Sequence, residues 1–210
     1  MDLMAMNKLT YGLFVLTARM NGKDNGCIIN TVQQVTVEPN RITVAVNKAN
    51  YTHDMICEAK KFNVSILSEK ADFEIFKRFG FQSGRNTDKF ANWTGYETAP
   101  NGISYITQGT NAYLSANVVE QKDLGSHTLF IAEVIDLQVL DAAPSVTYSY
   151  YHSHIKPKPQ EKQALAEEAK GQSVWRCEIC GYEYVGEELP ADYICPVCKH
   201  PASDFVRVEK

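Results

Sequence analysis

The chain has 210 residues, of which 44% are hydrophobic and 22% are charged, and its formal net charge is −4. These values are ordinary for soluble globular proteins, and they exclude binding to nucleic acid or a membrane surface through bulk positive charge. The N-terminus lacks a basic region followed by a long apolar run, and no stretch approaches the ~20 apolar residues that span a bilayer. We therefore expect a cytoplasmic protein.

Aromatic and β-branched runs separated by turn residues predict a series of strands. The expected strands cover residues 11–18, 27–36, 42–46, 62–67, 103–106, 112–122 and 128–139. A first helix is expected at 53–60, after Thr52, whose hydroxyl can cap free backbone amides. A second is expected at 71–80, with three phenylalanines on one face. Many strands with few helices predict a closed antiparallel barrel that has side helices.

The composition of the chain changes after residue 154. Lys156-Pro157-Lys158-Pro159 favours stiff, extended backbone, and a charged, alanine-rich segment follows it. We therefore divide the chain into a barrel domain at 1–154, a linker at 155–172 and a C-terminal module at 173–210. The module is too small to fold on its own apolar core, so a metal is expected to stabilise it.

Four of the six cysteines form two Cys-x-x-Cys pairs in this module. They are Cys177, Cys180, Cys195 and Cys198. In a reducing cytosol such pairs indicate a metal site rather than disulfides. Two facing pairs make a tetrahedron of thiolates that suits either zinc or iron. Gly181 follows the second cysteine, where it lets backbone amides turn toward the sulfur atoms, and such bonds raise the reduction potential of an iron centre.

The residues around these cysteines resemble rubredoxin. The resemblance rests on Trp-x-Cys-x-x-Cys-Gly-Tyr-x-Tyr from Trp175, Glu-Glu-Leu-Pro from Glu187, and Cys-Pro-x-Cys from Cys195. It implies a small rubredoxin-like domain with an Fe(Cys)4 site that transfers single electrons, whereas the cysteine pairs alone leave structural zinc open. Lys199 departs from the family, which usually has Gly after the fourth cysteine.

The charge and the chemistry of the module suggest its neighbours. Residues 173–210 contain seven acidic and four basic side chains, a net charge of −3. We therefore expect an electron acceptor with a basic docking face, although an acidic surface can also serve solubility alone. Rubredoxin iron moves one electron at a time, whereas a nicotinamide delivers two as hydride. Because a flavin converts between these modes, a flavin site is expected in the rest of the chain.

A candidate phosphate site lies at residues 47–52, Asn-Lys-Ala-Asn-Tyr-Thr. Lys48, Asn50 and Thr52 place a cation, an amide and a hydroxyl at the start of the expected helix, where free backbone amides and the helix dipole attract anions. The alternatives are a simple N-cap for Thr52 and a solvated charge for Lys48. The sequence has neither Gly-x-Gly-x-x-Gly nor a Walker loop, so a Rossmann-type nucleotide site is not indicated.

Residues 9–154 resemble the flavin reductase-like family, whose members are FMN-binding split barrels. The matching motifs are Leu-Thr-Tyr-Gly-Leu from Leu9, Asn30-Thr31 with Gln34-Val35-Thr36, Asn47 to Thr52, Phe-Gly-Phe-Gln-Ser-Gly-Arg from Phe79, Asp88-Lys89-Phe90, Ser126 to Phe130, and Tyr148 to Tyr151. The resemblance implies a mainly β fold, a split barrel with flanking helices, and a homodimer that holds FMN near the subunit interface.

The same resemblance assigns roles to individual residues. They are Asn30 and Thr31 for the isoalloxazine, Lys48, Asn50 and Thr52 for the ribityl chain and phosphate, Lys89 for covering the flavin or meeting substrate, and His127 for contacting or orienting the nicotinamide. Ser126 stands where the family has Asp before this histidine. A structural hydrogen bond is therefore the alternative role of His127.

A split barrel joined to rubredoxin resembles the high-molecular-weight rubredoxins. This resemblance implies an enzyme that transfers electrons from NAD(P)H via FMN to the iron and on to an acceptor protein. In that group the acceptor is typically a flavodiiron protein that reduces oxygen or nitric oxide. Two alternatives stay open. One is an FMN and iron electron carrier reduced by a separate reductase, which the missing Asp favours. The other is a flavin-binding regulator with a structural zinc module.

Overall fold

The computed structural model describes residues 3–157, 173–177, 182–195 and 201–208. The chain divides into two compact units, Met1–Lys156 and Pro157–Lys210. Most of the linker predicted at 155–172 lies outside the described residues, so the boundaries of the domain, the linker and the module stay predictions. Within the described parts of the chain, no helix is long and apolar enough to cross a membrane.

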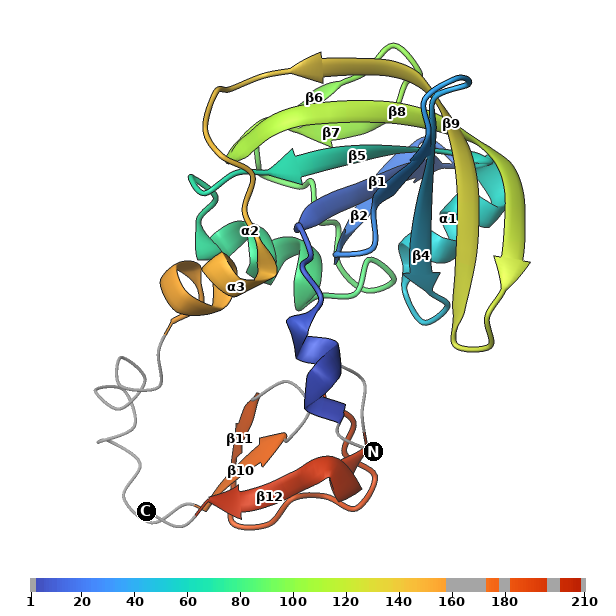
Figure 1. Ribbon diagram of the computed structural model, residues 1–210. Coiled ribbons are helices and arrows are strands. Elements are labelled where there is room, and N and C mark those ends of the chain that lie inside the picture. The colour runs from blue at the N-terminus through green and yellow to red at the C-terminus, as the bar shows by residue number, and fades with distance from the viewer. Residues whose placement is uncertain (1–2, 158–172, 178–181, 196–200, 209–210) are drawn as a thin grey trace. The chain divides into compact units, whose positions relative to one another are not determined.

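The first unit is built on one antiparallel sheet of seven strands in the order β2-β1-β5-β8-β9-β4-β3 (Figure 1). The strands are β1 Phe14–Met20, β2 Lys23–Ile29, β3 Gln33–Thr36, β4 Arg41–Asn47, β5 Lys61–Leu67, β8 Thr110–Asp123 and β9 His127–Val139. The long hairpin of β8 and β9 curves past the other strands (Figure 1). The prediction of a mainly β barrel with flanking helices is confirmed.

The barrel is split rather than closed. β2 and β3 are the two edges of the sheet, and no strand pairing between described residues joins them. Residues 27–36, predicted as one strand, instead form parts of β2 and β3 on either side of a bend at 30–32. Thr31 accounts for the bend, because its hydroxyl donates to the carbonyl of Ala45 (2.8 Å) and accepts from the amide of Ala45 (3.1 Å). The closed barrel was the wrong prediction, since the number of strands does not decide whether the edges meet.

The turn between β1 and β2 has a simple sequence origin. Asn21 and Gly22 both have positive φ, 51° and 78°, and connect Met20 to Lys23 as a two-residue loop. Asn-Gly is the favoured pair for such a loop, because its twist matches that of the strands. Two further strands, β6 (Tyr96–Thr98) and β7 (Ser104–Ile106), form a separate hairpin.

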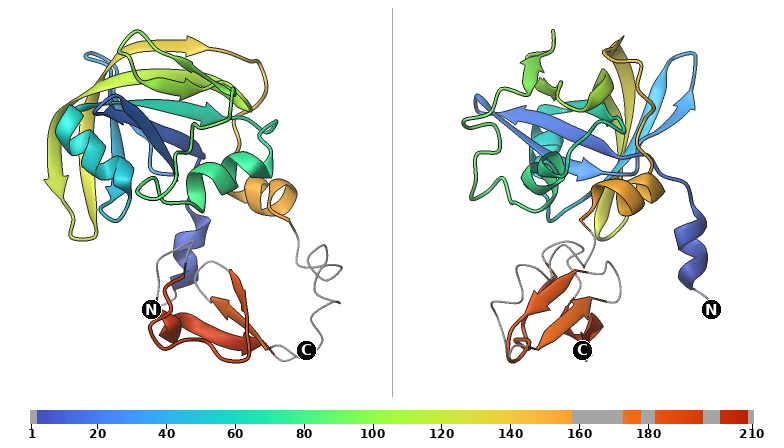
Figure 2. Two further views of the ribbon diagram at one scale, coloured as in Figure 1. Left: turned by 180° about the vertical axis from the view of Figure 1, so that it is seen from behind. Right: turned by 90° about the vertical axis from the view of Figure 1, so that its left-hand side faces the viewer.

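Helix α2 (Phe73–Gly80) packs beside the C-terminal segment of the first unit (Figure 2). The carboxylate of Asp72 accepts a hydrogen bond from the amide of Ile75 and caps the helix. The C-terminal segment consists of α3 (Tyr148–Tyr150) and one π-helical turn, Tyr151–Ile155. The ring centroids of Phe76 and Tyr151 are 4.4 Å apart, so an aromatic contact joins the two segments. The sequence analysis predicted α2 but not the helical C-terminal segment.

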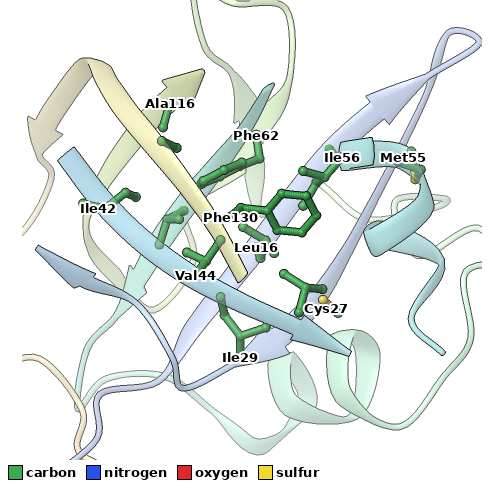
Figure 3. Packing of buried hydrophobic residues seen from close by; sticks show 14 residues of the cluster. Leu16, Cys27, Ile29, Ile42, Val44, Met55, Ile56, Phe62, Ala116 and Phe130 are labelled. Carbon is green, nitrogen blue, oxygen red and sulfur yellow. The ribbon is translucent and has the colours of Figure 1, made fainter. Parts of the chain in front are cut away.

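Apolar side chains fill the inside of the barrel (Figure 3). The even-numbered residues of 42–46 on β4 are buried, as the two-residue period of a strand requires. Phe62 and Phe130 are fully buried at the centre of this core. Helix α1 (Tyr51–Ala59) closes one end with Met55 among its buried residues.

Helix α1 begins earlier than predicted. Its N-cap is Asn50, which makes no side-chain capping bond. The prediction of Thr52 as N-cap is therefore wrong. Thr52 lies in the first turn, is fully buried, and accepts a hydrogen bond from Nδ2 of Asn25 at 3.0 Å. The hydroxyl thus joins the helix to β2 inside the protein instead of capping backbone amides.

The second unit contains a three-stranded antiparallel sheet in the order β11-β10-β12. Its strands are β10 Val174–Cys177, β11 Glu183–Val185 and β12 Phe205–Val208. Among its described residues, Cys177, Cys195 and Phe205 form the buried core, and partly buried Trp175, Tyr182, Tyr184, Leu189 and Tyr193 pack against them. This core is small, as the length of the module predicts.

Candidate flavin and metal sites

The β4–β9 ladder brings several of the predicted flavin-binding residues together. Asn47 at the end of β4 is paired with His127 at the start of β9. One residue further, the amide of Lys48 donates to the carbonyl of Ser126 at 3.0 Å. The start of α1, with Lys48 and Asn50, therefore lies beside the turn that contains His127. The local sequence does not reveal this proximity, because the two segments are far apart along the chain.

The bend after β2 lies against β4. The two bonds between Thr31 and Ala45 hold it there. Asn30 and Thr31 are both half-buried. The hydroxyl of Thr31 is already engaged, whereas the side chain of Asn30 makes no hydrogen bond with the described residues. An amide offers both donors and an acceptor, so Asn30 suits the polar edge of a flavin ring.

Lys48 has an anionic partner. Its Nζ lies 2.7 Å from Oδ1 of Asp123, which also accepts from the amide of Gly125 at 2.7 Å. The hydrogen bond from Lys48, followed by that from Gly125, holds the pKa of the Asp123 carboxyl below its usual value. The pair is exposed and therefore weak. A phosphate bound here would share the ammonium of Lys48 with Asp123.

Two of the predicted flavin-binding side chains lie inside the protein. The hydroxyl of Thr52 is engaged with Asn25. Lys89 is only 3% exposed, and its ammonium donates to the carbonyls of Gly26 (2.8 Å) and Phe79 (3.2 Å). These bonds tie the chain after α2 to β2. Lys89 thus stabilises the fold from inside the protein. Its buried position does not support the predicted contact with flavin or substrate.

His127 has an orienting partner despite the missing Asp. Oγ of Ser126 lies 2.9 Å from Nδ1 of the imidazole, and the histidine is half-buried. A serine can hold the ring in one direction without adding a negative charge beside it. The structural bond that was the alternative role of His127 therefore exists, and Nε2 of the ring makes no hydrogen bond with the described residues.

A hydrogen-bonded chain that the sequence analysis missed crosses α1. Oγ1 of Thr128 lies 2.8 Å from Nε2 of His53, and Nδ1 of His53 lies 3.1 Å from Oδ1 of Asp54. Oδ2 of Asp54 accepts from Nη2 of Arg85 at 2.5 Å. The bond to His53, followed by that to Arg85, lowers the pKa of the Asp54 carboxyl. No sequence motif could have revealed this chain, since Thr128 is 75 positions from His53 and Arg85 is 31 positions from Asp54.

The described half of the metal site is a pair of buried thiols. Cys177 and Cys195, the first cysteines of the two pairs, are both fully buried in the small core with Phe205. Neither forms a disulfide. Cys180, Cys198, Gly181 and Lys199 lie outside the described residues. Thiols gathered in an aromatic, water-poor core fit a thiolate-bound metal, and the surrounding rings would limit solvent access to it.

Comparisons with known proteins agree with this architecture. The flavin reductase like domain family matches residues 6–158, and the rubredoxin-like domain of rubrerythrin matches residues 175–206. The chain belongs to the flavin reductase-like family. The prediction of this family with a C-terminal rubredoxin-like domain is confirmed, and so are the classes of its cofactors, a flavin and iron. The protein is an oxidoreductase that acts in flavin-linked electron transfer.

Two curated relatives are similar over most of the chain. High molecular weight rubredoxin of Moorella thermoacetica is 35% identical over 94% of this chain and 96% of its own length. Ferric-chelate reductase (NAD(P)H) of Archaeoglobus fulgidus is 38% identical over 81% of this chain and 100% of its own length. The first relative therefore covers nearly the whole chain, whereas the second leaves part of it without a counterpart.

Among solved structures, the fold resembles the NADH:FAD oxidoreductase SgcE6 of Streptomyces globisporus C-1027, with a TM-score of 0.62 and 21% identity. That likeness covers 70% of this chain and 86% of the other. An FMN-binding protein from Thermus thermophilus has a TM-score of 0.59 over 67% of this chain and 82% of its own, at 21% identity. At these identities the likeness establishes the fold of the first unit.

Proposed function

We propose that this protein transfers electrons from NAD(P)H via FMN to an Fe(Cys)4 centre and on to an acceptor protein in the cytoplasm. The main support is the presence in one chain of a flavin reductase-like unit and a module that buries Cys177 and Cys195. When bound, a flavin exchanges hydride for single electrons, which is the conversion that a rubredoxin iron site needs. High molecular weight rubredoxin and ferric-chelate reductase (NAD(P)H) are both similar to this chain.

In this proposal the flavin lies where the bend after β2, the start of α1 and the β8–β9 turn meet. Asn30 and Thr31 meet the isoalloxazine, and Lys48 and Asn50 meet the ribityl chain and phosphate together with the first turn of α1, where Thr52 lies. His127, held by Ser126, contacts or orients the nicotinamide. Lys89 supports the site indirectly, because its buried ammonium donates to two backbone carbonyls and so stabilises the surrounding fold.

We also propose a homodimer, which would place the flavin near an interface between two copies. The support is an apolar surface on β9, where Ile135, Leu137 and Val139 are 51%, 60% and 75% exposed. Three large apolar side chains exposed at alternate positions of one strand are unusual for a monomer. Sedimentation velocity of the FMN-loaded protein should give twice the chain mass, and Leu137→Asp should lower it to the mass of one chain.

The proposed acceptor is a flavodiiron-type oxygen or nitric oxide reductase with a basic docking face. The acidic charge of the module supports the docking face. A related segment also forms 22% of a putative diflavin flavoprotein of Nostoc, so a domain of this type is found within a larger flavoprotein. Removal of residues 173–210 should leave FMN reduction intact and abolish reduction of the acceptor. Unchanged turnover of the acceptor would contradict the proposed relay.

Anaerobic stopped-flow mixing with NADH and with NADPH tests the enzymatic part. The flavin absorbance should bleach first and the ferric absorbance of the module second. If neither nucleotide reduces the flavin while a separate reductase does, the protein is a carrier without its own nicotinamide site. A colourless module with stoichiometric zinc after growth in iron-rich medium would favour the regulator instead.

A second candidate function is the reduction of ferric chelates. The supporting observation is the 38% identity to ferric-chelate reductase (NAD(P)H), whose whole length is matched by 81% of this chain. Ferric citrate should then be reduced equally well by the full chain and by the chain without residues 173–210. Loss of this activity on removal of the module would instead mean that the iron centre delivers the electrons.

A further inference from the structure

A cavity of about 650 Å³ lies between the β1–β2 turn, α1 and the chain that follows α2. The turn contributes Met20, Asn21, Lys23, Asp24 and Asn25, α1 contributes Tyr51 and Met55, and the third wall is residues 84–88. Its volume is in the range of sites for small molecules, about 300–1,000 Å³. Three of the family motifs contribute to it through Tyr51, Arg85 and Asp88, whereas the wall formed by the β1–β2 turn belongs to none of them.

The third wall is fixed in place by packing. A side chain on Gly84 would overlap the amide of Asn25, so the chain passes directly against β2 there. Lys89 holds Gly26 on β2 and Phe79 on α2. Arg85 lies 5.1 Å over the ring of Tyr51 and pairs with Asp54. The cavity is therefore preformed on three sides.

The charged groups of the cavity differ in how far they are already engaged. Asp24 pairs with Arg19 and accepts from the amide of Ser104. Oδ1 of Asp88 accepts from the amides of Phe90 and Ala91, whereas its Oδ2 accepts no bond from the described residues. Lys23 is exposed and makes no ion pair within the described part of the chain.

This arrangement suits a ligand with several kinds of group. Lys23 and Arg85 are natural partners of phosphate oxygens. Oδ2 of Asp88 can accept from a sugar hydroxyl, and the amides of Asn21 and Asn86 can donate to and accept from the edge of a heterocyclic base. The partly exposed Met20 offers adaptable apolar contact to the face of such a base.

We propose that this cavity binds the adenosine-phosphate end of the nicotinamide nucleotide, an inference that rests on the proposed NAD(P)H-dependent function. Lys23 and Arg85 meet the phosphate groups, Asp88 meets a ribose hydroxyl, and Asn21 and Asn86 meet the adenine. Phosphate recognition by side chains in this cavity is consistent with the absence of a glycine-rich nucleotide motif from the sequence. The cavity then determines the affinity for the donor and takes no part in hydride transfer.

The test uses the holoprotein with FMN and iron bound and compares two donors. Reduced nicotinamide mononucleotide lacks the adenosine end, so it cannot use the cavity. Lys23→Gln and Asn86→Ala are expected to raise KM for NADH and NADPH about five- to tenfold, as expected for one lost polar or charge-assisted contact. The same variants should leave kcat and the KM for the mononucleotide unchanged. Lys77→Gln, on the exposed face of α2 and outside the cavity, is the matched control. It should leave KM unchanged for the dinucleotides and for the mononucleotide.

Calorimetric titration of the holoprotein with ADP-ribose is a second measurement that does not depend on hydride transfer. Binding to the wild type that weakens in Lys23→Gln supports the proposal, even if the flavin proves to be reduced by another protein. Equal effects of Lys23→Gln on both donors, or no binding of ADP-ribose, would overturn it. A rise in the dissociation constant of FMN in Lys23→Gln would overturn it as well, because the cavity would then hold the flavin phosphate.

Discussion

The two units of the chain obtain their stability from different sources. The barrel buries large apolar side chains in two clusters, with Phe62, Phe79 and Phe130 among the fully buried ones. The described part of the module has three buried core residues, of which two, Cys177 and Cys195, are predicted metal ligands. Burial of apolar area can support the barrel alone, whereas we expect the module to depend on a bound metal. The units should therefore fail under different perturbations.

The largest expected effect follows from loss of the metal. Cys177→Ser should abolish iron binding and unfold the module, because the binding energy of a metal in a small site is also its folding energy. The barrel should keep its melting temperature. Scanning calorimetry measures the unfolding of the two units, and iron analysis measures the bound metal. Cys57→Ser, a substitution of a free cysteine in the barrel, is the control and should retain full iron. A module that stays folded in Cys177→Ser would contradict the comparison.

The reverse perturbation is a cavity in the barrel core. Phe130→Ala removes a fully buried ring and should lower the free energy of unfolding of the barrel by about 3–5 kcal/mol. The ferric absorbance of the module should not change. Phe81→Ala, at a phenylalanine that is 38% exposed, should have a much smaller effect. Loss of iron in Phe130→Ala would mean that the module cannot fold independently of the barrel.

A buried cation provides a smaller test within the barrel. Lys89→Met keeps the length of the side chain but removes the ammonium that bonds Gly26 and Phe79. Denaturant unfolding should show a loss of about 1.5–3 kcal/mol, the usual range for hydrogen bonds to a charged group. Lys77→Met, at an exposed lysine paired with Glu74, should cost under about 1 kcal/mol. Equal losses of unfolding free energy in the two variants would contradict a stabilising role for the buried ammonium of Lys89.

The smallest expected effect is a pH dependence confined to the barrel. The pKa of Asp54 lies below its ordinary value of 3.8 because His53 and Arg85 bond its carboxylate. The folded protein therefore binds fewer protons here than the unfolded chain, and this stabilisation is present above pH 3.8 and is lost as the pH falls through the lowered pKa. The side chain is 43% exposed, so the effect should stay under about 1 kcal/mol. Asp54→Asn should flatten the acid limb of the barrel's unfolding curve, and an unchanged limb would contradict this assignment.

Local patterns were sufficient for most of the fold. Aromatic and β-branched runs between turn residues located β4, β5, β8 and β9 to within a few residues of their ends, because these residue types favour extended backbone. The phenylalanines of α2 likewise located that helix. The same patterns failed at residues 27–36, where a side-chain hydrogen bond from Thr31 to β4 interrupts an apparently continuous strand. Such a bond depends on a partner that local sequence does not contain.

The candidate sites also include features that the local sequence predicts and features that only the tertiary structure shows. The spacing of the cysteines predicts the metal site from the sequence alone, since four ligands in two tight loops need little from the rest of the fold. The family motifs predict that Lys48 and His127 share one flavin site, but only the β4–β9 ladder shows how the segments that contain them become neighbours. Burial of Thr52 and Lys89, the chain from Thr128 to Arg85, and the cavity beside Lys23 all required the tertiary structure. They arise from contacts between residues far apart in the sequence, which the packing of the barrel decides.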